Sequence, residues 1–346
     1  MNFRRVLRLK PGNRVAILSP SATVPSRFPE VALMGIENLR EYFDLDPVIL
    51  PGAFEDTQRN YENPGIRVAD LVRAFSDDDL RGIFATIGGD ESIRVLPLLD
   101  RKLLVSNTKS FMGYSDCCTY HTYLATLGNC SLHGPAIMAG FAQIESLPVS
   151  YVEYISRVLF SDSTGLEMNA FDEYSNGYPD WGAPGNATRV NAKVSSDPWK
   201  WLQGTSIRGR LFAGNVEVLD WIRGTEFWPP PEFWNGVFLI LETSEEVPQP
   251  VAVERYLRSY GISGILHRIG GLAFGRFRGY SREMIHEVEK RIMSVVRVEF
   301  HLNDLPVVTG LDVGHTDPQF PIPNGVNGEI RQGEDVLRIL GSYTNP

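Results

Sequence analysis

Short apolar runs alternate with helical patterns over about the first 150 residues, and this alternation most constrains the fold. Segments 14–22, 80–90 and 109–114 are apolar runs that end in small or polar residues, as buried strands do. Helical spacing of apolar residues separates them, for example over 29–43. Strands joined by helices predict a parallel sheet covered on both faces, so we expect an α/β domain.

The same kind of pattern resumes in the second half of the chain, after a gap of about forty residues. A length of 346 residues suits two domains rather than one core. We therefore expect an N-terminal α/β domain over 1–160, a linker or substrate loop over 161–204 and a C-terminal α/β domain over 205–346. The loop is rich in Gly, Pro, Asn and Ser but also carries Trp181, Trp199 and Trp201, which argue for a functional loop over a disordered one.

Charge and hydropathy exclude several classes of protein. The formal net charge is −9, which leaves no basic surface to neutralise phosphates, so we expect no nucleic-acid partner. No apolar segment reaches the about 18 residues of a membrane span, and the N-terminus lacks a signal-peptide pattern. Three cysteines, two of them adjacent, do not make a disulfide framework. We expect a cytoplasmic protein that acts on a small substrate.

The stretch Gly113-Tyr114-Ser115-Asp116 follows a predicted strand and precedes a predicted helix. It matches most of the G-x-S-x-G nucleophile elbow, in which a tight turn exposes a serine hydroxyl. In that geometry the N–H of Asp116 would point toward a developing oxyanion. Ser115 or Asp116 could equally be the N-cap of an ordinary helix.

Three further stretches carry candidate chemistry. Gly88-Gly89 ends a predicted strand, where a backbone N–H can approach a ligand or simply form a turn. Asn215 and Glu217 begin a predicted helix and by themselves are explained as its cap and first-turn acid. His315, in a Gly-His-Thr-Asp-Pro turn after an apolar strand, is placed either as a general base or as a solvated turn residue.

Alternative nucleophiles and metal sites find less support. Cys117 with His121 four residues later could form a cysteine hydrolase, but this helix face is expected to pack on the sheet, which favours core packing for both residues. His133 ends another predicted strand and could line the same cleft. There is no His-Glu-x-x-His, Cys-x-x-Cys or dinucleotide fingerprint, so we expect no metal and no cofactor.

Taken together, five ordered stretches resemble one family. They are "DLVRAFSDDDLRGIFATIGGDESIRVLPLLD", "KSFMGYSD", "SLHGP", "GRLFAGNVEVLD" and "DVGHTDPQFPIPNG", and they resemble the LD-carboxypeptidase family of serine peptidases over nearly the whole chain. The resemblance implies a catalytic triad of Ser115, His315 and Glu217. It also implies an oxyanion hole formed by the N–H groups of Gly89 and Asp116.

The resemblance further implies the architecture. An N-terminal three-layer α/β domain, flavodoxin-like or glutamine-amidotransferase-like, would carry the serine, and a C-terminal α/β domain with a mixed sheet would carry the glutamate and histidine. The site would then lie between the domains, and the protein would be a homodimer.

The long loop resembles that of the microcin C immunity (MccF-like) subgroup. This implies hydrolysis of the amide between an amino acid and a nucleotide-like moiety, with Trp181 stacked on the base, Tyr174 as a second face and Asn215 as a further substrate-binding residue. Trp181 could instead serve packing. The runner-up is a murein tetrapeptide LD-carboxypeptidase that releases D-alanine, and a less favoured alternative is a non-catalytic solute-binding protein. Asp90, Glu91 and the Cys117-Cys118 pair depart from the family pattern and leave the substrate open.

Overall fold

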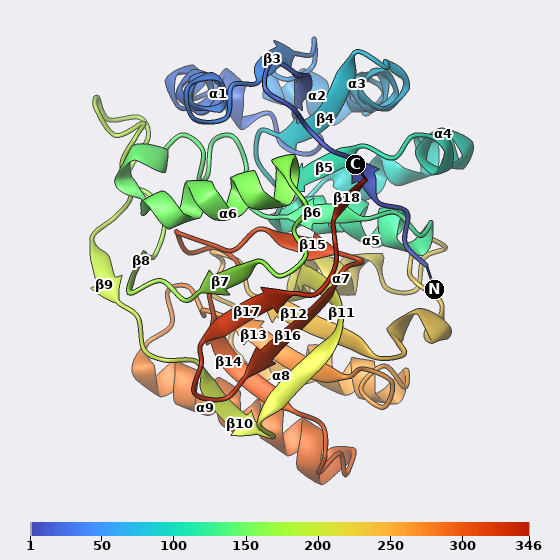
Figure 1. The fold of residues 1–346 in the computed structure, drawn as a ribbon, viewed down its shortest axis with the longest axis vertical. Helices are drawn as coiled ribbons and strands as arrows, with labels where there is room; N and C mark the ends of the chain where they lie inside the picture. The colour runs from blue at the N-terminus through green and yellow to red at the C-terminus, as the bar shows by residue number, and fades with distance from the viewer. Residues whose placement is uncertain (1, 346) are drawn as a thin grey trace.

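The computed structural model describes residues 2–345, which form two main sheets stacked along the long axis of the molecule (Figure 1). Both belong to a mixed α/β architecture, which confirms the predicted fold class.

The N-terminal sheet has six strands in the order β15-β6-β5-β4-β2-β3. Strands β3 to β6 and β2 are parallel, whereas β15 arrives from the C-terminal part of the chain and runs antiparallel to β6. The strands are β2 (Arg14–Leu18), β3 (Asp46–Ile49), β4 (Leu80–Ala85), β5 (Ser110–Gly113), β6 (Ser131–His133) and β15 (Ile322–Asn324).

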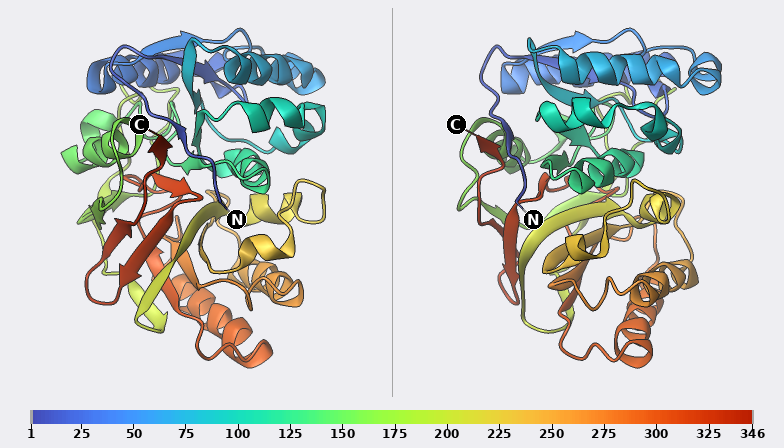
Figure 2. Two further views of the ribbon diagram at one scale, coloured as in Figure 1. Left: turned by 45° about the vertical axis from the view of Figure 1, so that its right-hand side comes forward. Right: turned by 90° about the vertical axis from the view of Figure 1, so that its right-hand side faces the viewer.

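Helices cover both faces of this sheet, which makes the three predicted layers (Figure 2). Alternate residues of β2 explain why: Val15 and Ile17 pack toward α1 and α6, while Ala16 and Leu18 pack toward α3, α4 and α5. The helices are α1 (Pro29–Phe43), α2 (Thr57–Glu62), α3 (Gly65–Ser76), α4 (Arg101–Ser106), α5 (Cys118–Thr126) and α6 (Val149–Phe160). The α1 bounds agree with the predicted helix over 29–43.

The C-terminal sheet has eight strands in the order β10-β14-β13-β12-β11-β16-β17-β7. Its centre, β11 to β14, is parallel and its flanks are antiparallel, so the sheet is mixed as expected. The strands are β7 (Glu167–Asn169), β10 (Lys200–Gln203), β11 (Ser206–Asn215), β12 (Val237–Glu242), β13 (Gly271–Gly275), β14 (Val307–Leu311), β16 (Asn327–Arg331) and β17 (Val336–Ile339).

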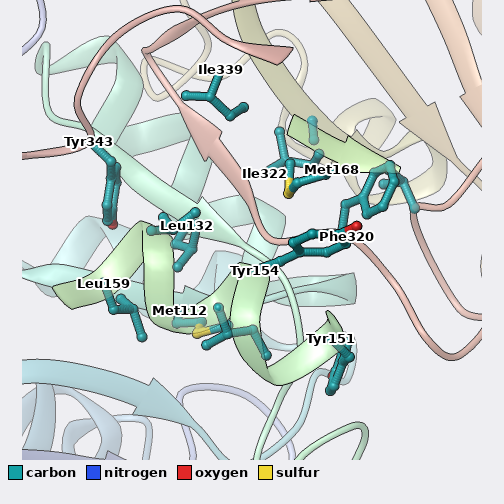
Figure 3. Close-up of a cluster of buried hydrophobic side chains, with 14 of the residues drawn as sticks. Met112, Leu132, Tyr151, Tyr154, Leu159, Met168, Phe320, Ile322, Ile339 and Tyr343 are labelled. Carbon is teal, nitrogen blue, oxygen red and sulfur yellow. The ribbon is translucent and has the colours of Figure 1, made fainter. Parts of the chain in front are cut away.

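One face of the C-terminal sheet packs against α7 (Val216–Ile222), α8 (Pro250–Ile262) and α9 (Arg282–Met293). Its other face shares a continuous apolar core with α1, α6 and the N-terminal sheet. Figure 3 shows this core, where Met112 and Leu132 lie with α6 residues and with Phe320, Ile322 and Ile339 from the C-terminal part of the chain. The shared core fixes the two sheets relative to each other.

Short elements complete the chain. Two small sheets pair β1 (Val6–Leu7) with β18 (Thr344–Asn345) and β8 (Glu173–Ser175) with β9 (Lys193–Ser195). The 3-10 turns are Val24–Ser26, Ser92–Arg94, Leu96–Leu98, Ser115–Cys117, Ile144–Ser146 and Pro231–Trp234, and a π-helical turn spans Ser294–Glu299. None of the described helices is long and apolar enough to cross a membrane.

The segment 161–204, expected as a linker or substrate loop, begins and ends in the C-terminal sheet, because β7 and β10 form the two edges of that sheet. Between them the β8–β9 hairpin carries an excursion that bends back toward the serine turn. Isolated backbone hydrogen bonds between Ser175 and Asp317 attach the hairpin to the turn that follows His315.

Candidate active site

Ser115 lies at the carboxyl end of β5, on the turn that leads into α5. Its φ of 60° is in the left-handed region, which is unusual for a residue with a side chain and typical of functional turns. All other residues between 111 and 125 are buried, whereas Ser115 is partly exposed. The turn therefore presents this hydroxyl to the surface of a cavity, as the elbow motif predicts.

Glycines permit the close packing around this turn. A Cβ on Gly88 would lie 2.7 Å from the Ser115 Cβ and 3.1 Å from the Asp116 amide nitrogen, and a Cβ on Gly113 would lie 2.8 Å from the Cys117 Sγ. Only glycine fits at both places without displacing its neighbours. The Gly88-Gly89 loop at the end of β4 thus lies directly against the serine turn.

The Asp116 carboxylate joins the two loops. It accepts hydrogen bonds from the Ser21 hydroxyl at 2.5 Å and from the Ser92 N–H at 2.9 Å, and Asp116 is fully buried. Gly89 sits in the same place with φ of 148°, where a Cβ would lie 2.4 Å from the Ser21 Oγ. These contacts hold the Gly89 and Asp116 backbones, the two expected oxyanion donors, beside Ser115.

His315 reaches the same cavity from the C-terminal sheet, on the turn after β14. It is 6% exposed, and its ring packs edge-on against Tyr114 at 4.8 Å between centroids. Its Nδ1 lies 2.7 Å from Oε2 of Glu242, the last residue of β12. An imidazole held by a buried carboxylate on one nitrogen is the arrangement of a catalytic general base.

Glu217, which the resemblance implied as the triad carboxylate, does not occupy this position. Its Oε1 accepts hydrogen bonds from the Ser244 N–H at 3.0 Å and the Ser244 hydroxyl at 2.8 Å. Glu242 was missed in the sequence because it reads as the end of an apolar strand. The available signal was a carboxylate ending a buried parallel strand, where functional side chains gather in α/β sheets.

Gly314 explains how the His315 turn approaches Glu242. Its φ is 100°, and a Cβ there would lie 2.7 Å from the Glu242 Cβ and 2.9 Å from its Oε2. A side chain at 314 would therefore press on the carboxylate that holds the imidazole.

A second carboxylate contacts the other ring nitrogen. Oε2 of Glu245 lies 3.1 Å from His315 Nε2. Burial alone lowers the pKa of His315, but the Glu242 and Glu245 carboxylates outweigh it and raise this pKa to about 10. The hydrogen bond from His315 lowers the pKa of Glu245 to about 2. The resting arrangement thus favours a protonated imidazole whose Nε2 is engaged by Glu245.

An aromatic cavity of about 340 Å³ opens over Ser115 and His315. Trp181 lines it between Phe28 and Tyr178, with ring centroids 5.9 Å and 5.3 Å away. The long loop therefore brings Trp181 to the serine, where the resemblance expected it. Flat aromatic walls favour a flat ligand.

Tyr174, expected as a second stacking face, lies elsewhere. It lines a different cavity, and the Arg276 guanidinium sits 4.6 Å from its ring centroid. The tyrosine on the aromatic cavity is Tyr178, whose hydroxyl donates to Asp317. Both tyrosines lie in the same loop, so only its tertiary path could distinguish them.

A second cavity of about 280 Å³ meets the first at Ser115 and Gly89. Asn215 lines it and caps α7, since its Oδ1 accepts the Val218 N–H at 3.0 Å. The cap agrees with the interpretation from the sequence, and the position in the cavity agrees with a substrate-contacting residue. Glu217 lines the same cavity.

The cysteine alternative finds no geometric support. Cys117 is fully buried, and burial raises the pKa of its thiol well above the usual value, which disfavours the thiolate that would be the nucleophile. His121 is a core residue as expected: its ring nitrogens lie 2.9 Å from the Ser131 Oγ and 2.8 Å from the Gly113 carbonyl oxygen.

One cluster has the composition of a metal site. Donor atoms of Cys118, His133 and Glu242 lie within 4.8 Å of one another and are buried, although the sequence showed no ligand spacing because they come from three distant segments. Burial raises the pKa of the Cys118 thiol well above its usual value, and Sγ already accepts the Asn215 N–H at 3.1 Å. A protonated thiol is a poor metal ligand, so we assign this cluster no ion.

The fold and these side chains define a class, a two-domain α/β serine hydrolase. Family models for the LD-carboxypeptidase N-terminal and C-terminal domains match residues 15–134 and 208–330. The chain therefore belongs to the LD-carboxypeptidase family of serine peptidases.

Relatives within this family have different names. The chain is 26% identical to the Microcin C7 self-immunity protein MccF of Escherichia coli over 77% of this chain and 75% of that protein. It is 23% identical to a probable murein peptide carboxypeptidase of Bacillus subtilis, over 96% and 92% respectively. An MccF-like protein from Streptococcus pneumoniae, solved in complex with AMP, superposes with a TM-score of 0.81 at 25% identity, over 95% of this chain and 98% of that one.

Proposed function

We propose that this protein hydrolyses an amide bond by covalent catalysis through Ser115, His315 and Glu242. The observation that carries the proposal is the 2.7 Å contact between His315 Nδ1 and Glu242, in a cavity that Ser115 also lines. Glu242 holds the imidazole in the tautomer that leaves Nε2 free to accept a proton and stabilises the imidazolium that forms.

In the proposed mechanism, the Ser115 Oγ attacks the scissile carbonyl carbon while its proton passes to His315 Nε2. The N–H groups of Gly89 and Asp116 stabilise the tetrahedral oxyanion. His315 then protonates the leaving nitrogen, the C–N bond breaks, and water activated by the same imidazole hydrolyses the acyl-enzyme. Because Glu245 engages Nε2 in the resting arrangement, it must move away before His315 can act as a base.

For the substrate, we propose an amide between an amino acid and a nucleotide-like moiety. The aromatic cavity of Phe28, Tyr178 and Trp181 beside Ser115 supports a flat base on one side of the scissile bond. The similar MccF-like protein that binds AMP supports the same ligand class. The alternative of a murein peptide is favoured by the named carboxypeptidase relative, which the chain covers over nearly its full length. The cytoplasmic location and the homodimer stay predictions.

The deciding experiment offers the purified protein an aminoacyl sulfamoyl adenosine and a murein tetrapeptide side by side, with products identified by mass spectrometry. We expect release of the amino acid from the nucleotide analogue. Cleavage of the murein peptide alone would contradict the proposed substrate and favour the alternative.

The nucleophile is tested with Ser115→Ala and Cys117→Ser proteins and the cleaved substrate. We expect the first variant to lose activity by a factor on the order of 10⁴ or more and the second to retain it. Retained activity in the first and loss in the second would contradict the serine mechanism.

A further inference from the structure

The cavity that joins the aromatic one at Ser115 is strongly acidic. Four of its lining residues are carboxylates, and among its described lining residues there is no Lys or Arg. The acidic side chains are Asp90, Glu217, Glu245 and Glu246. We call this space the acidic pocket.

Two buried side chains of the acidic pocket have polar atoms without a partner. Glu217 is 7% exposed, and its Oε2 has no hydrogen-bond partner among residues 2–345. Asn215 is fully buried, and within the same range its Nδ2 has none either. Native proteins seldom leave buried polar groups unsatisfied, so such atoms at a cavity wall indicate the place of a ligand.

The unpartnered Glu217 oxygen indicates a cation. Burial, and then the nearby Glu242 charge, raise the pKa of Glu217, so the carboxylate lacks the positive partner that would stabilise it. The indole of Trp221, 42% exposed, stands at the rim, and an aromatic face beside carboxylates suits an ammonium group. The nearest named cation, Arg278, lies on the aromatic cavity and acts on Glu245.

We propose that the acidic pocket binds the acyl part of the substrate and selects an amino acid whose side chain ends in an ammonium group. This rests on the proposed function, since the two cavities meet at the nucleophile and the aromatic one is taken by the flat leaving group. An α-ammonium alone would balance one carboxylate, whereas the pocket presents four. A lysine-like or diamino-acid side chain supplies the second positive charge, and Glu217 accepts its hydrogen bond. An acidic acyl group is repelled.

The test measures binding, by calorimetry, to Ser115→Ala protein, so that turnover does not interfere. The probes are lysyl, norleucyl and glutamyl sulfamoyl adenosine, together with the dipeptides L-lysyl-D-alanine and L-norleucyl-D-alanine. We expect the lysyl compound of each series to bind at least about tenfold more tightly than its norleucyl partner, the effect of one charge-assisted hydrogen bond. The glutamyl analogue should bind most weakly.

Matched variants in the Ser115→Ala background identify the selecting residues. Glu217→Gln and Glu246→Gln should reduce the lysyl to norleucyl affinity ratio and leave norleucyl binding unchanged. Glu153→Gln, on the exposed face of α6, serves as the control and should preserve the ratio.

The outcomes separate this inference from the proposed function. Equal lysyl and norleucyl affinities in both series would overturn the inference, even if the intact enzyme cleaves the nucleotide analogues. Lysine preference in the dipeptides, with no binding of any nucleotide analogue, would sustain the inference and contradict the proposed leaving group. Failure of all five compounds to bind would overturn both.

Discussion

At the scale of single residues, the site depends on which carboxylate holds the imidazole. Glu242 and Glu217 are both buried and lie near enough for each to affect the other's ionisation, yet only Glu242 contacts His315. The two residues therefore offer a matched pair of isosteric substitutions.

We expect Glu242→Gln to lower kcat by roughly 10³-fold or more, because an amide neither fixes the required tautomer nor stabilises the imidazolium. Glu217→Gln should change kcat by less than about tenfold with an uncharged acyl side chain, since its loss removes only uniform binding. Steady-state kinetics of both variants measure this. A larger loss in Glu217→Gln than in Glu242→Gln would restore the assignment implied by the resemblance.

Glu245 is expected to set the pH dependence. Its carboxylate contributes to the raised pKa of His315, and catalysis needs the neutral imidazole, so activity should rise with pH as His315 loses its proton. Glu245→Gln lowers the His315 pKa and should move the acidic limb of the kcat/KM profile to lower pH. The profile is measured with a substrate that has an uncharged acyl side chain. An unchanged limb, or a shift to higher pH, would show that Glu245 does not act on His315 in solution.

At the scale of elements, the loop between α6 and β10 determines one wall of the site. The β8–β9 hairpin is attached to the His315 turn through Asp317, which accepts from the Tyr178 hydroxyl and exchanges backbone hydrogen bonds with Ser175. The loop thus places Trp181 and Tyr178 over the serine although it lies outside both parallel sheet centres.

Trp181→Ala should weaken binding of a nucleotide analogue by about 1 to 3 kcal/mol, the contribution of base stacking on an aromatic ring. The effect should appear in KM, or in the Kd of the Ser115→Ala protein, and leave kcat for a substrate without a base unchanged. Tyr174→Ala is the matched control, because that ring lies at Arg276. Equal effects of the two substitutions would argue against stacking by Trp181.

At the scale of the whole molecule, the two domains share a core and exchange strands. Strand β15 completes the N-terminal sheet, β18 pairs with β1, and the Tyr343 hydroxyl lies 3.0 Å from the Ser110 Oγ of β5. Tyr343 is fully buried with Leu159 and Ile339 in the shared core (Figure 3). The positions of Ser115 and His315 therefore depend on contacts far from the site.

Tyr343→Ala should lower the free energy of unfolding by about 3 to 5 kcal/mol, as for other large aromatic deletions. Tyr343→Phe, which loses only the hydroxyl, should cost about 1 kcal/mol. Urea unfolding followed by fluorescence and by circular dichroism measures both, and the two probes should give one common transition because the core spans both domains. Separate transitions for the two probes would contradict the coupling.

The sequence by itself determined the elements and the nucleophile. Periodic apolar residues settle which segments become strands and helices, as for 29–43, and a small-residue turn between strand and helix marks Ser115, because both signals are local. Only the tertiary structure decided that Glu242 and not Glu217 holds His315, that Tyr178 and not Tyr174 joins Trp181, and that four carboxylates gather beside the serine. Such choices between neighbouring candidates depend on how sheets and loops from distant segments pack, and no local pattern along the chain encodes those distances.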